Sequence, residues 1–130
     1  LAPLRALVGR PSNEFAASSQ ALAPWPLSLG RADYRIGPLV CFELAEPAMA
    51  GAYANADATL LVNASNLGWF HGNHALQSQF VALGQLRAAE TGLPVAIAAN
   101  TGDSALIDGH GTLLARLGPD VTGTARLPQP

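Results

Sequence analysis

Short, continuous apolar runs alternate along the chain with longer stretches of helical periodicity. Three such runs predict strands, at residues 34–41, 58–63 and 94–100. Continuous runs of this length are typical of strands that are covered on both faces. Two helices are predicted between the runs, at residues 45–55 and 74–91. This order of strands and helices predicts an α/β domain with helices packed on a central sheet.

The longer helix has an apolar face and a clear end. Side chains spaced three or four apart share one face of residues 74–91, and they are Leu76, Phe80, Leu83 and Arg87. Gly92 is a good C-terminal cap, because glycine adopts the left-handed conformation that ends many helices. Glu46 and Pro47 mark the start of the shorter helix, since proline is favoured in the first turn. The sequence therefore predicts the end of the longer helix and the start of the shorter one.

The first part of the chain differs in composition from the rest. Residues 1–33 are rich in Ala, Pro and Ser, and they predict an irregular arm with a short helix at 3–8. The folded domain is predicted to span residues 34–130. The chain begins with Leu1 rather than Met, so we expect it to be processed or to be part of something longer.

A hairpin is predicted near the other end of the chain. Gly109, His110 and Gly111 separate two apolar segments at 105–108 and 112–117, and a glycine-rich break of this kind is a strong hairpin signal. Residues 121–127 then predict a last strand.

Composition excludes several classes of function. Hydrophobic residues make up 49% of the chain and charged residues 12%, which argues against intrinsic disorder. The net charge is −2, so there is no electrostatic case for nucleic-acid binding. All seven basic residues are Arg, and the chain contains no Lys. Its apolar runs fall short of the about 18 residues of a membrane span, so the chain itself is not expected to cross a membrane.

Metal and disulfide chemistry find little support in the sequence. Cys41 is the one cysteine, so an intrachain disulfide cannot form. His71 and His74 have a spacing that can chelate a metal on a helix, but no Glu lies between them and no Cys or carboxylate spacing supports a site. No metal is therefore predicted. A serine-hydrolase elbow of the G-x-S-x-G type is also missing.

Cys41 is the first candidate catalytic residue. It lies at the end of an apolar strand, where a rigid element holds a side chain at the mouth of a crevice. As a nucleophile it would use the next backbone amide, that of Phe42, to stabilise an oxyanion. Glu43 lies two residues on, and an extended chain would place it on the same side as the thiol. Taken alone, Cys41 reads more simply as a small buried hydrophobe and Glu43 as a surface acid.

Polar residues also follow the next two predicted strands. The stretch 63–70 carries Asn66, Trp69 and Phe70, which suit a loop lining an active-site mouth. Asn100 starts a short turn after the third strand. Ordinary turn chemistry, or aromatic side chains covering the core, would explain these segments equally well.

Four ordered blocks together resemble the carbon–nitrogen hydrolase (nitrilase) superfamily. They are C-F-E at 41–43, N-x-S-N-x-x-W-F at 63–70, R-A-x-E at 87–90 and N-T-G at 100–102. The first two blocks look most like those of the apolipoprotein N-acyltransferases. The resemblance covers residues 34–117, which is most of the chain.

The resemblance implies a fold and a set of site residues. The fold is an αββα sandwich, and this chain would form the C-terminal portion of its catalytic domain, with a mixed sheet and helices on one face. Cys41 would be the nucleophile and Glu43 the carboxylate that follows it in the family motif. The family's general-base Glu and its Lys would precede residue 1. We therefore expect the 130-residue chain by itself to be inactive, to expose apolar surface and to self-associate.

The resemblance also implies substrates and a location. The reaction would transfer a fatty acyl chain from a phospholipid, through a Cys41 thioester, to the N-terminal amine of a diacylglyceryl-cysteine lipoprotein. It would need no cofactor, because the amide product is more stable than the thioester. The parent enzyme would be embedded in the bacterial inner membrane with its catalytic domain facing the periplasm. Trp25, Trp69 and Phe70 would contact lipid, since amphipathic aromatic side chains favour interfaces.

Three positions depart from the family pattern, and two other functions stay open. Leu67 stands where the family often has Asp, His71 where it has Gly, and Phe80 where it has His. These positions surround the expected substrate mouth. One alternative function is that of a soluble nitrilase-type amidase acting on a small amide. The other is a non-catalytic α/β domain that binds a partner or lipid through the Trp69–Phe70 loop.

Overall fold

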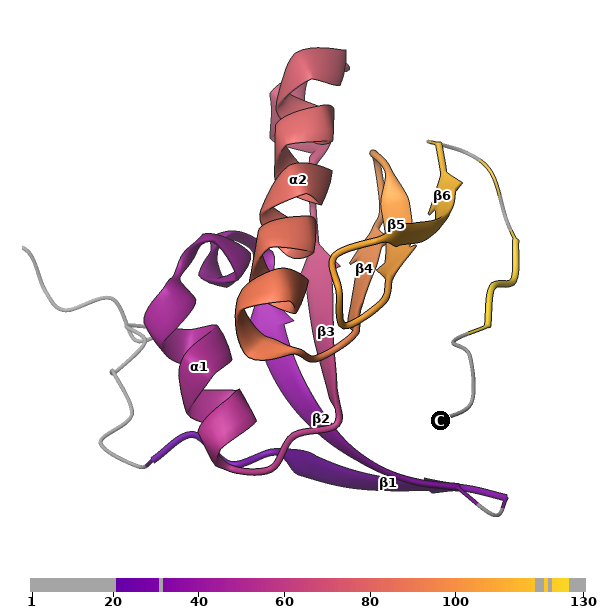
Figure 1. Cartoon of the computed structure of the whole chain (residues 1–130). Helices are drawn as coiled ribbons and strands as arrows, with labels where there is room; N and C mark the ends of the chain where they lie inside the picture. Colours follow the sequence, from indigo (N-terminus) through magenta and orange to yellow (C-terminus); the bar gives the residue numbers. More distant parts are fainter. Residues whose placement is uncertain (1–20, 31, 119–120, 122, 127–130) are drawn as a thin grey trace, which may run out of the picture.

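The computed structural model describes residues 21–30, 32–118, 121 and 123–126, and within them the chain forms one mixed sheet with helices on one face (Figure 1). The elements are β1 (Trp25–Leu29), β2 (Ala32–Val40), η2 (Cys41–Ala45), α1 (Pro47–Asn55), β3 (Leu60–Ser65), η3 (Gly68–Phe70), α2 (His74–Thr91), β4 (Val95–Ala99), β5 (Ser104–Ile107) and β6 (Leu113–Leu117). Here η denotes a short 3₁₀ turn. The predicted α/β class and one-sided helix layer are confirmed.

The strands lie in the sheet in the same order as in the chain. Strands β2, β3 and β4 are parallel and are connected through α1 and α2, whereas the other neighbouring pairs are antiparallel. Leu39 of β2 is paired with Asn63 of β3, which in turn is paired with Ile97 of β4. The carboxyl ends of the three parallel strands therefore meet at one edge, where α/β sheets place their crevices.

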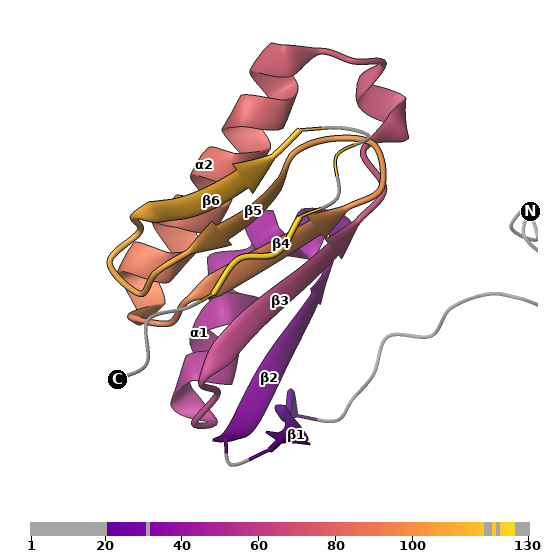
Figure 2. The same ribbon diagram turned by 90° about the vertical axis from the view of Figure 1, so that its right-hand side faces the viewer.

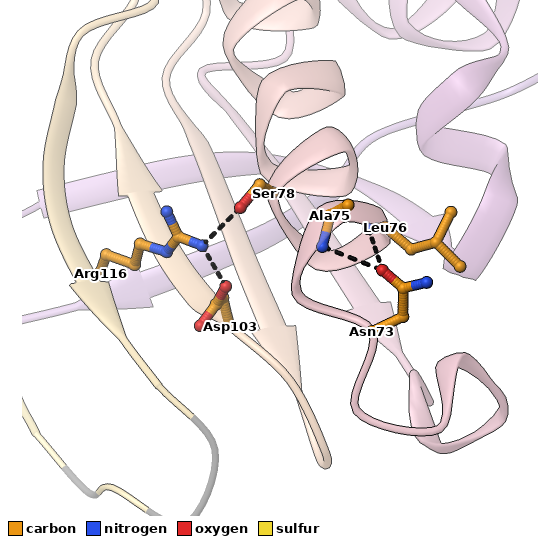
Figure 3. A network of polar contacts seen from close by, with 6 residues as sticks. All are labelled: Asn73, Ala75, Leu76, Ser78, Asp103 and Arg116. Carbon is orange, nitrogen blue, oxygen red and sulfur yellow. Dashed lines mark hydrogen bonds and ion pairs between the residues drawn. The ribbon is translucent and has the colours of Figure 1, made fainter.

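Side-chain and backbone caps explain where the helices begin and end. Glu46 caps α1 by accepting a hydrogen bond from the Ala48 N–H at 3.2 Å, and Pro47 follows in the first turn, as predicted. Asn73 caps α2, and its Oδ1 accepts hydrogen bonds from the next turn (Figure 3). Gly92 ends α2 with φ 72°, which also agrees with the prediction. One detail was wrong: Leu76 is 38% exposed rather than on the buried face with Phe80.

The hydrophobic core lies between the sheet and the two helices. Each strand from β2 to β5 sends alternate side chains towards α1 and α2, and the buried ones include Leu39, Leu61, Val95, Ile97 and Ile107. Two glycines let the layers approach closely. A Cβ atom at Gly37 would lie 2.8 Å from Cγ of Tyr53 on α1, and one at Gly84 of α2 would lie 2.8 Å from Cδ1 of Ile97. Larger residues at these two positions would push the helices off the sheet.

The opposite face of the sheet is also apolar, but it is less covered. Figure 2 views the molecule from this side, with both helices behind the strands. Its side chains include Ile36, Leu60 and Leu106, which are only partly buried and line an open hollow. In the described part of the chain, only Ala125 and Arg126 reach this hollow from beyond the last strand. The two-sided apolar character predicted for these strands is therefore confirmed, although one side has little cover.

Two predictions about the ends of the chain need correction. The irregular arm predicted for residues 1–33 includes a regular strand, β1, which pairs with β2 in antiparallel register from Trp25↔Ile36 to Leu29↔Ala32. Pro26 is tolerated there because β1 is the edge strand of the described sheet. The short helix predicted at 3–8 lies outside the described residues.

The hairpin is confirmed, whereas the last strand is not. Strands β5 and β6 pair in antiparallel fashion around the glycine turn, as predicted. The described residues of the segment predicted as a final strand, 121 and 123–126, have no strand structure, because they pair with no neighbour. None of the helices in the described part of the chain combines the length and apolar character needed to cross a membrane.

Candidate active site

Cys41 occupies a tight turn at the carboxyl end of β2. It is the first residue of η2 and has φ 51°, in the left-handed region. This conformation costs a residue with a side chain roughly 1–2 kcal/mol, so the surrounding structure must hold it. Residues in such conformations often lie at functional sites. The alternative interpretation of Cys41 as a small buried core residue does not hold, because Cys41 is only partly buried.

Two polar side chains hold the backbone on either side of Cys41. Oε2 of Glu43 accepts a hydrogen bond from the Val40 N–H at 2.7 Å. Nδ2 of Asn63 donates to the carbonyl of Cys41 at 3.0 Å and to that of Leu39 at 3.2 Å. These contacts tie the turn to the ends of β2 and β3.

Glu43 does not lie where an extended chain would place it. Residues 41–45 form a 3₁₀ turn, so Glu43 is rotated back towards the strand and binds the Val40 N–H instead of standing beside the thiol along an extended strand. Its carboxylate also lies near Tyr53. Burial, and after it the charge of Glu43, raises the pKa of the Tyr53 phenol above 10.0. The carboxylate is therefore engaged with the protein as well as being close to Cys41.

Three of the predicted site residues meet in one hollow of about 630 Å³. Cys41, Asn66 and Asn100 line it, and they follow β2, β3 and β4 respectively. Ser65 and Ser104 also contribute to its wall. The three parallel strands bring these residues together although they are far apart in the sequence. The hollow opens at the carboxyl edge of the sheet, with Cys41 in its wall.

Hydrogen bonds fix the loops that carry the two asparagines. Oδ1 of Asn66 accepts from the Gly68 N–H at 3.1 Å, and Oδ1 of Asn100 accepts from Oγ1 of Thr101 at 2.9 Å. The Asn100 N–H donates to the carbonyl of Ser65 at 3.2 Å, which ties the two loops together. The predicted turn at Asn100 is therefore present and forms one wall of the hollow.

The predicted aromatic residues form a separate cluster beside the hollow. Ring centroids lie 5.4 Å apart for Phe42 and Trp69, and 4.6 Å apart for Trp69 and Phe70. Phe70 is only 5% exposed and packs against Phe80 in the core, whereas Trp69 is 53% exposed. The prediction that Phe70 faces a substrate is therefore not supported by its position. Trp69 and the half-exposed Phe42 form the outer surface of the cluster, and the Phe42 N–H follows Cys41 directly in the turn.

An ion pair anchors the loop that follows β4. Asp103 is buried and pairs with Arg116 of β6, which also donates to Oγ of Ser78 on α2 at 3.1 Å (Figure 3). This network fastens the loop between Asn100 and Ser104 to the hairpin and the helix. Within α2, the predicted pair of Arg87 and Glu90 is also present, at 3.1 Å.

Sequence reasoning missed Asn63 and Ser65 as site residues. Both lie on β3 and both are buried, and Oγ of Ser65 donates to Oδ1 of Asn63 at 2.6 Å. A signal was available, because two polar residues at alternate positions interrupt an otherwise apolar strand and so share its core-facing side. Buried polar side chains need partners, and here the partner is the turn that carries Cys41.

Metal ligands are not gathered anywhere in the part of the chain that the structure describes. No group of three or more His, Cys, Asp or Glu side chains is arranged to hold an ion there. The functional groups around the hollow are a thiol, backbone amides, amide side chains and hydroxyls. Such a site is suited to covalent catalysis on an acyl group.

Comparisons with known proteins agree with this description. An apolipoprotein N-acyltransferase from Shewanella oneidensis is 32% identical over 123 residues, which cover 95% of this chain and 23% of that protein. Another, from Geobacter metallireducens, is 43% identical over 77 residues, which cover 59% of this chain and 15% of that protein. The chain therefore spans less than a quarter of the length of these two curated relatives.

Solved structures show the same fold. An amidase from a Nesterenkonia species superposes with a TM-score of 0.61 at 25% identity, over 82% of this chain and 40% of that one. A carbon–nitrogen hydrolase from Helicobacter pylori superposes with a TM-score of 0.60 at 19% identity, over 65% of this chain and 36% of that one. The sequence profile of the family described as carbon-nitrogen hydrolase matches residues 9–127. With its mixed sheet, its helix layer and its cysteine turn, the chain belongs to the carbon-nitrogen hydrolase family.

Proposed function

We propose that the protein transfers a fatty acyl chain from a phospholipid to the N-terminal amine of a diacylglyceryl-cysteine lipoprotein, with Cys41 as the nucleophile. The observation that carries the proposal is the strained turn that holds Cys41 in the wall of the hollow at the sheet edge. The names of the relatives support the acyl transfer: they are apolipoprotein N-acyltransferases, at 32% and 43% identity.

The proposed reaction has two steps. The Cys41 thiolate attacks the ester carbonyl of the phospholipid, and the lysophospholipid leaves with a proton, so that a thioester remains on the sulfur. The lipoprotein amine then attacks the thioester carbonyl, the carbon–sulfur bond breaks, and the thiol is regenerated as the amine loses its proton. The chemistry needs no metal or cofactor. The Phe42 N–H is proposed to stabilise the oxyanion that forms in each step.

The remaining predicted residues have proposed roles around this centre. Asn66 and Asn100 are proposed to contact the polar part of the substrate, since both line the hollow. Glu43 is proposed to keep the Cys41 turn in shape through the Val40 N–H and to set the charge beside the substrate amine. Trp69 and Phe42 present exposed aromatic surface next to the hollow, and we propose that acyl chains lie against it at the periplasmic face of the inner membrane.

Mass spectrometry provides a direct test. The protein expressed from its complete coding sequence is incubated with phospholipid vesicles and analysed intact and as peptides. We expect an acyl adduct on the peptide that contains Cys41, and we expect hydroxylamine to remove it because thioesters are sensitive to that reagent. The Cys41→Ala variant should fold normally, carry no adduct and transfer no acyl chain. Acyl transfer by that variant would refute the proposal.

Hydrolysis of a small amide is a second candidate function. The Nesterenkonia amidase supports it, since it is 25% identical over most of this chain. The same sample distinguishes the two functions. Ammonia release from short aliphatic amides, without a lipid-derived adduct on Cys41, would favour the amidase. An adduct without ammonia release would favour the acyltransferase.

A further inference from the structure

Asn63 is a fully buried polar residue in the middle of the sheet. It lies on β3, which is flanked by β2 and β4, and its exposed fraction is 0%. Its side chain is on the same side of the strand as Leu61, facing the helix layer. The reaction proposed above does not use it, and it does not line the hollow. A buried amide in such a place is costly unless all its hydrogen bonds are made.

The amide nitrogen of Asn63 binds the cysteine turn. The Nδ2 group has two hydrogens, and it donates to the carbonyls of Leu39 and Cys41. Oδ1 accepts from the hydroxyl of Ser65 at 2.6 Å. Because backbone carbonyls can only accept, the NH₂ group must face them, which leaves Oδ1 to accept from the Ser65 hydroxyl. Asn63 therefore bridges Leu39, near the end of β2, and Cys41.

The carbonyls of Leu39 and Cys41 lie on either side of the Cys41 φ torsion, which is the strained torsion of the turn. Between them the chain leaves the extended conformation of β2 and enters the left-handed conformation of Cys41 at φ 51°. A single amide that binds both carbonyls fixes the angle between them. Glu43 acts on the same turn from the other side, through the Val40 N–H. Without Asn63 the turn can relax, and the thiol would leave the wall of the hollow.

We propose that Asn63 is a positioning residue for the Cys41 thiol, holding the turn that places the nucleophile at the hollow, while the Ser65 hydroxyl satisfies its Oδ1. The role as part of an acyl-transfer site rests on the function proposed above. The geometric claim does not depend on it, because it concerns the reactivity of the thiol towards any electrophile. Asn63 does not line the hollow, and it acts through the backbone of Cys41.

Val and Thr have nearly the same shape, so comparing them at position 63 isolates the contribution of a hydrogen bond to the two carbonyls. Asn63→Val removes both donors, whereas Asn63→Thr keeps one hydroxyl that can donate to one carbonyl. Leu61→Ala is the matched control, because Leu61 is equally buried two residues earlier on the same strand face and has no polar contact with the turn. The control reports what a general loss of stability at this place does to activity.

Each variant is made in the protein expressed from its complete coding sequence and is measured below its melting temperature. The first readout is the rate at which iodoacetamide alkylates Cys41, as a function of pH, and the second is kcat and KM for acyl transfer. For Asn63→Val we expect alkylation and kcat to fall about 10- to 100-fold, with KM nearly unchanged. Asn63→Thr should recover part of that loss. Leu61→Ala should lower the melting temperature and leave both rates within about twofold.

The outcomes separate this proposal from the proposed function. Alkylation and kcat that stay at the wild-type level in folded Asn63→Val would overturn the positioning role, even if an acyl adduct forms on Cys41. Slow alkylation in Asn63→Val would support the positioning role even if no acyl adduct ever forms on the wild type. If Asn63→Val does not fold, Ser65→Ala decides the question. It removes the hydroxyl that binds Oδ1 of Asn63, and alkylation no slower than in the wild type would overturn the proposal.

Discussion

The two faces of the sheet carry similarly apolar side chains, but they differ in what covers them. On the helix side, residues such as Leu61, Val95 and Ile107 are completely buried beneath α1 and α2. On the other side, Ile36, Leu60 and Val62 are just as hydrophobic and yet remain partly exposed. Parallel strands with two apolar faces are found in sheets with a layer on each side. The comparison indicates that these strands suit a sheet with a layer on each face, of which the helices form one.

The hollow that contains Cys41 lies on the less covered side of the sheet. Besides Cys41, its wall includes Val40, Ala64 and Ala98, which point away from the helices at the ends of three strands. Asn63, which binds the cysteine turn, points the other way into the core. One face therefore supplies the mouth of the site, while the other supplies the rigid support behind it.

The largest effect is expected on the helix-covered face. Phe80→Ala removes an aromatic ring that is buried between α2, η2 and η3, and it should lower the free energy of unfolding by about 3–5 kcal/mol. Urea unfolding of the complete protein measures this loss. A change below about 1 kcal/mol would mean that the aromatic cluster is not packed as described.

The next prediction concerns the other face. If a second layer covers it in the complete protein, Val62→Asp buries an unpaired charge and should lower the free energy of unfolding by about 3 kcal/mol. If the face is bare, the change should stay within about 0.5 kcal/mol, as for ordinary surface positions. Ala82→Asp, at an exposed position on α2, is the control for adding the same charge. If Val62→Asp and Ala82→Asp changed the free energy of unfolding equally, the face that carries Val62 would not be covered.

The third prediction concerns self-association of the 130-residue chain by itself, for which we expect a smaller effect than for the two losses of stability. Its less covered apolar face should make it self-associate, and light scattering should give an average mass that rises with concentration. Val62→Asp should reduce this association, whereas Ala82→Asp should leave it unchanged. A monomer at all concentrations would count against the self-association that we predict from the sequence.

The smallest effect on stability is expected from Asp108 in the hairpin turn between β5 and β6. The N–H groups of Thr112 and, to a lesser degree, His110 bind the Asp108 carboxylate and lower the pKa of Asp108 below 3.8, despite an opposing contribution from burial. A lowered folded-state pKa means that the ionised group stabilises the fold above pH 3.8 and that this contribution is lost as the pH falls below it. The difference in unfolding free energy between wild type and Asp108→Ala should therefore shrink from pH 6 to pH 3. A difference independent of pH would contradict this assignment.

Much of the fold could be predicted because it rests on local signals. The apolar runs of β2, β3 and β4, the proline and glycine at the ends of the helices, and the glycine turn of the hairpin all lie within a few residues of the structure they specify. Strand β1 was missed because its proline-rich sequence has no strand pattern of its own. Only its pairing with β2 makes it a strand, and that pairing depends on the neighbour.

The candidate site was predicted in part. Cys41, Asn66 and Asn100 were found because each follows a recognisable strand, and parallel strands end at the same edge. Phe70 and Glu43 were placed less well. The local pattern of an aromatic or an acid does not tell whether the side chain turns inward, as Phe70 does, or back onto the strand, as Glu43 does.

By itself the sequence determined the order of the elements, their boundaries and the edge at which polar residues gather, because periodicity and caps act over one or two turns of chain. Only the tertiary structure decided that Cys41 takes a left-handed turn and that Asn63 holds it. That contact joins residues 22 positions apart, and it exists because the register of β2 against β3 sets Asn63 beside Leu39. Register is a property of packed strands, so no single segment of the sequence contains it.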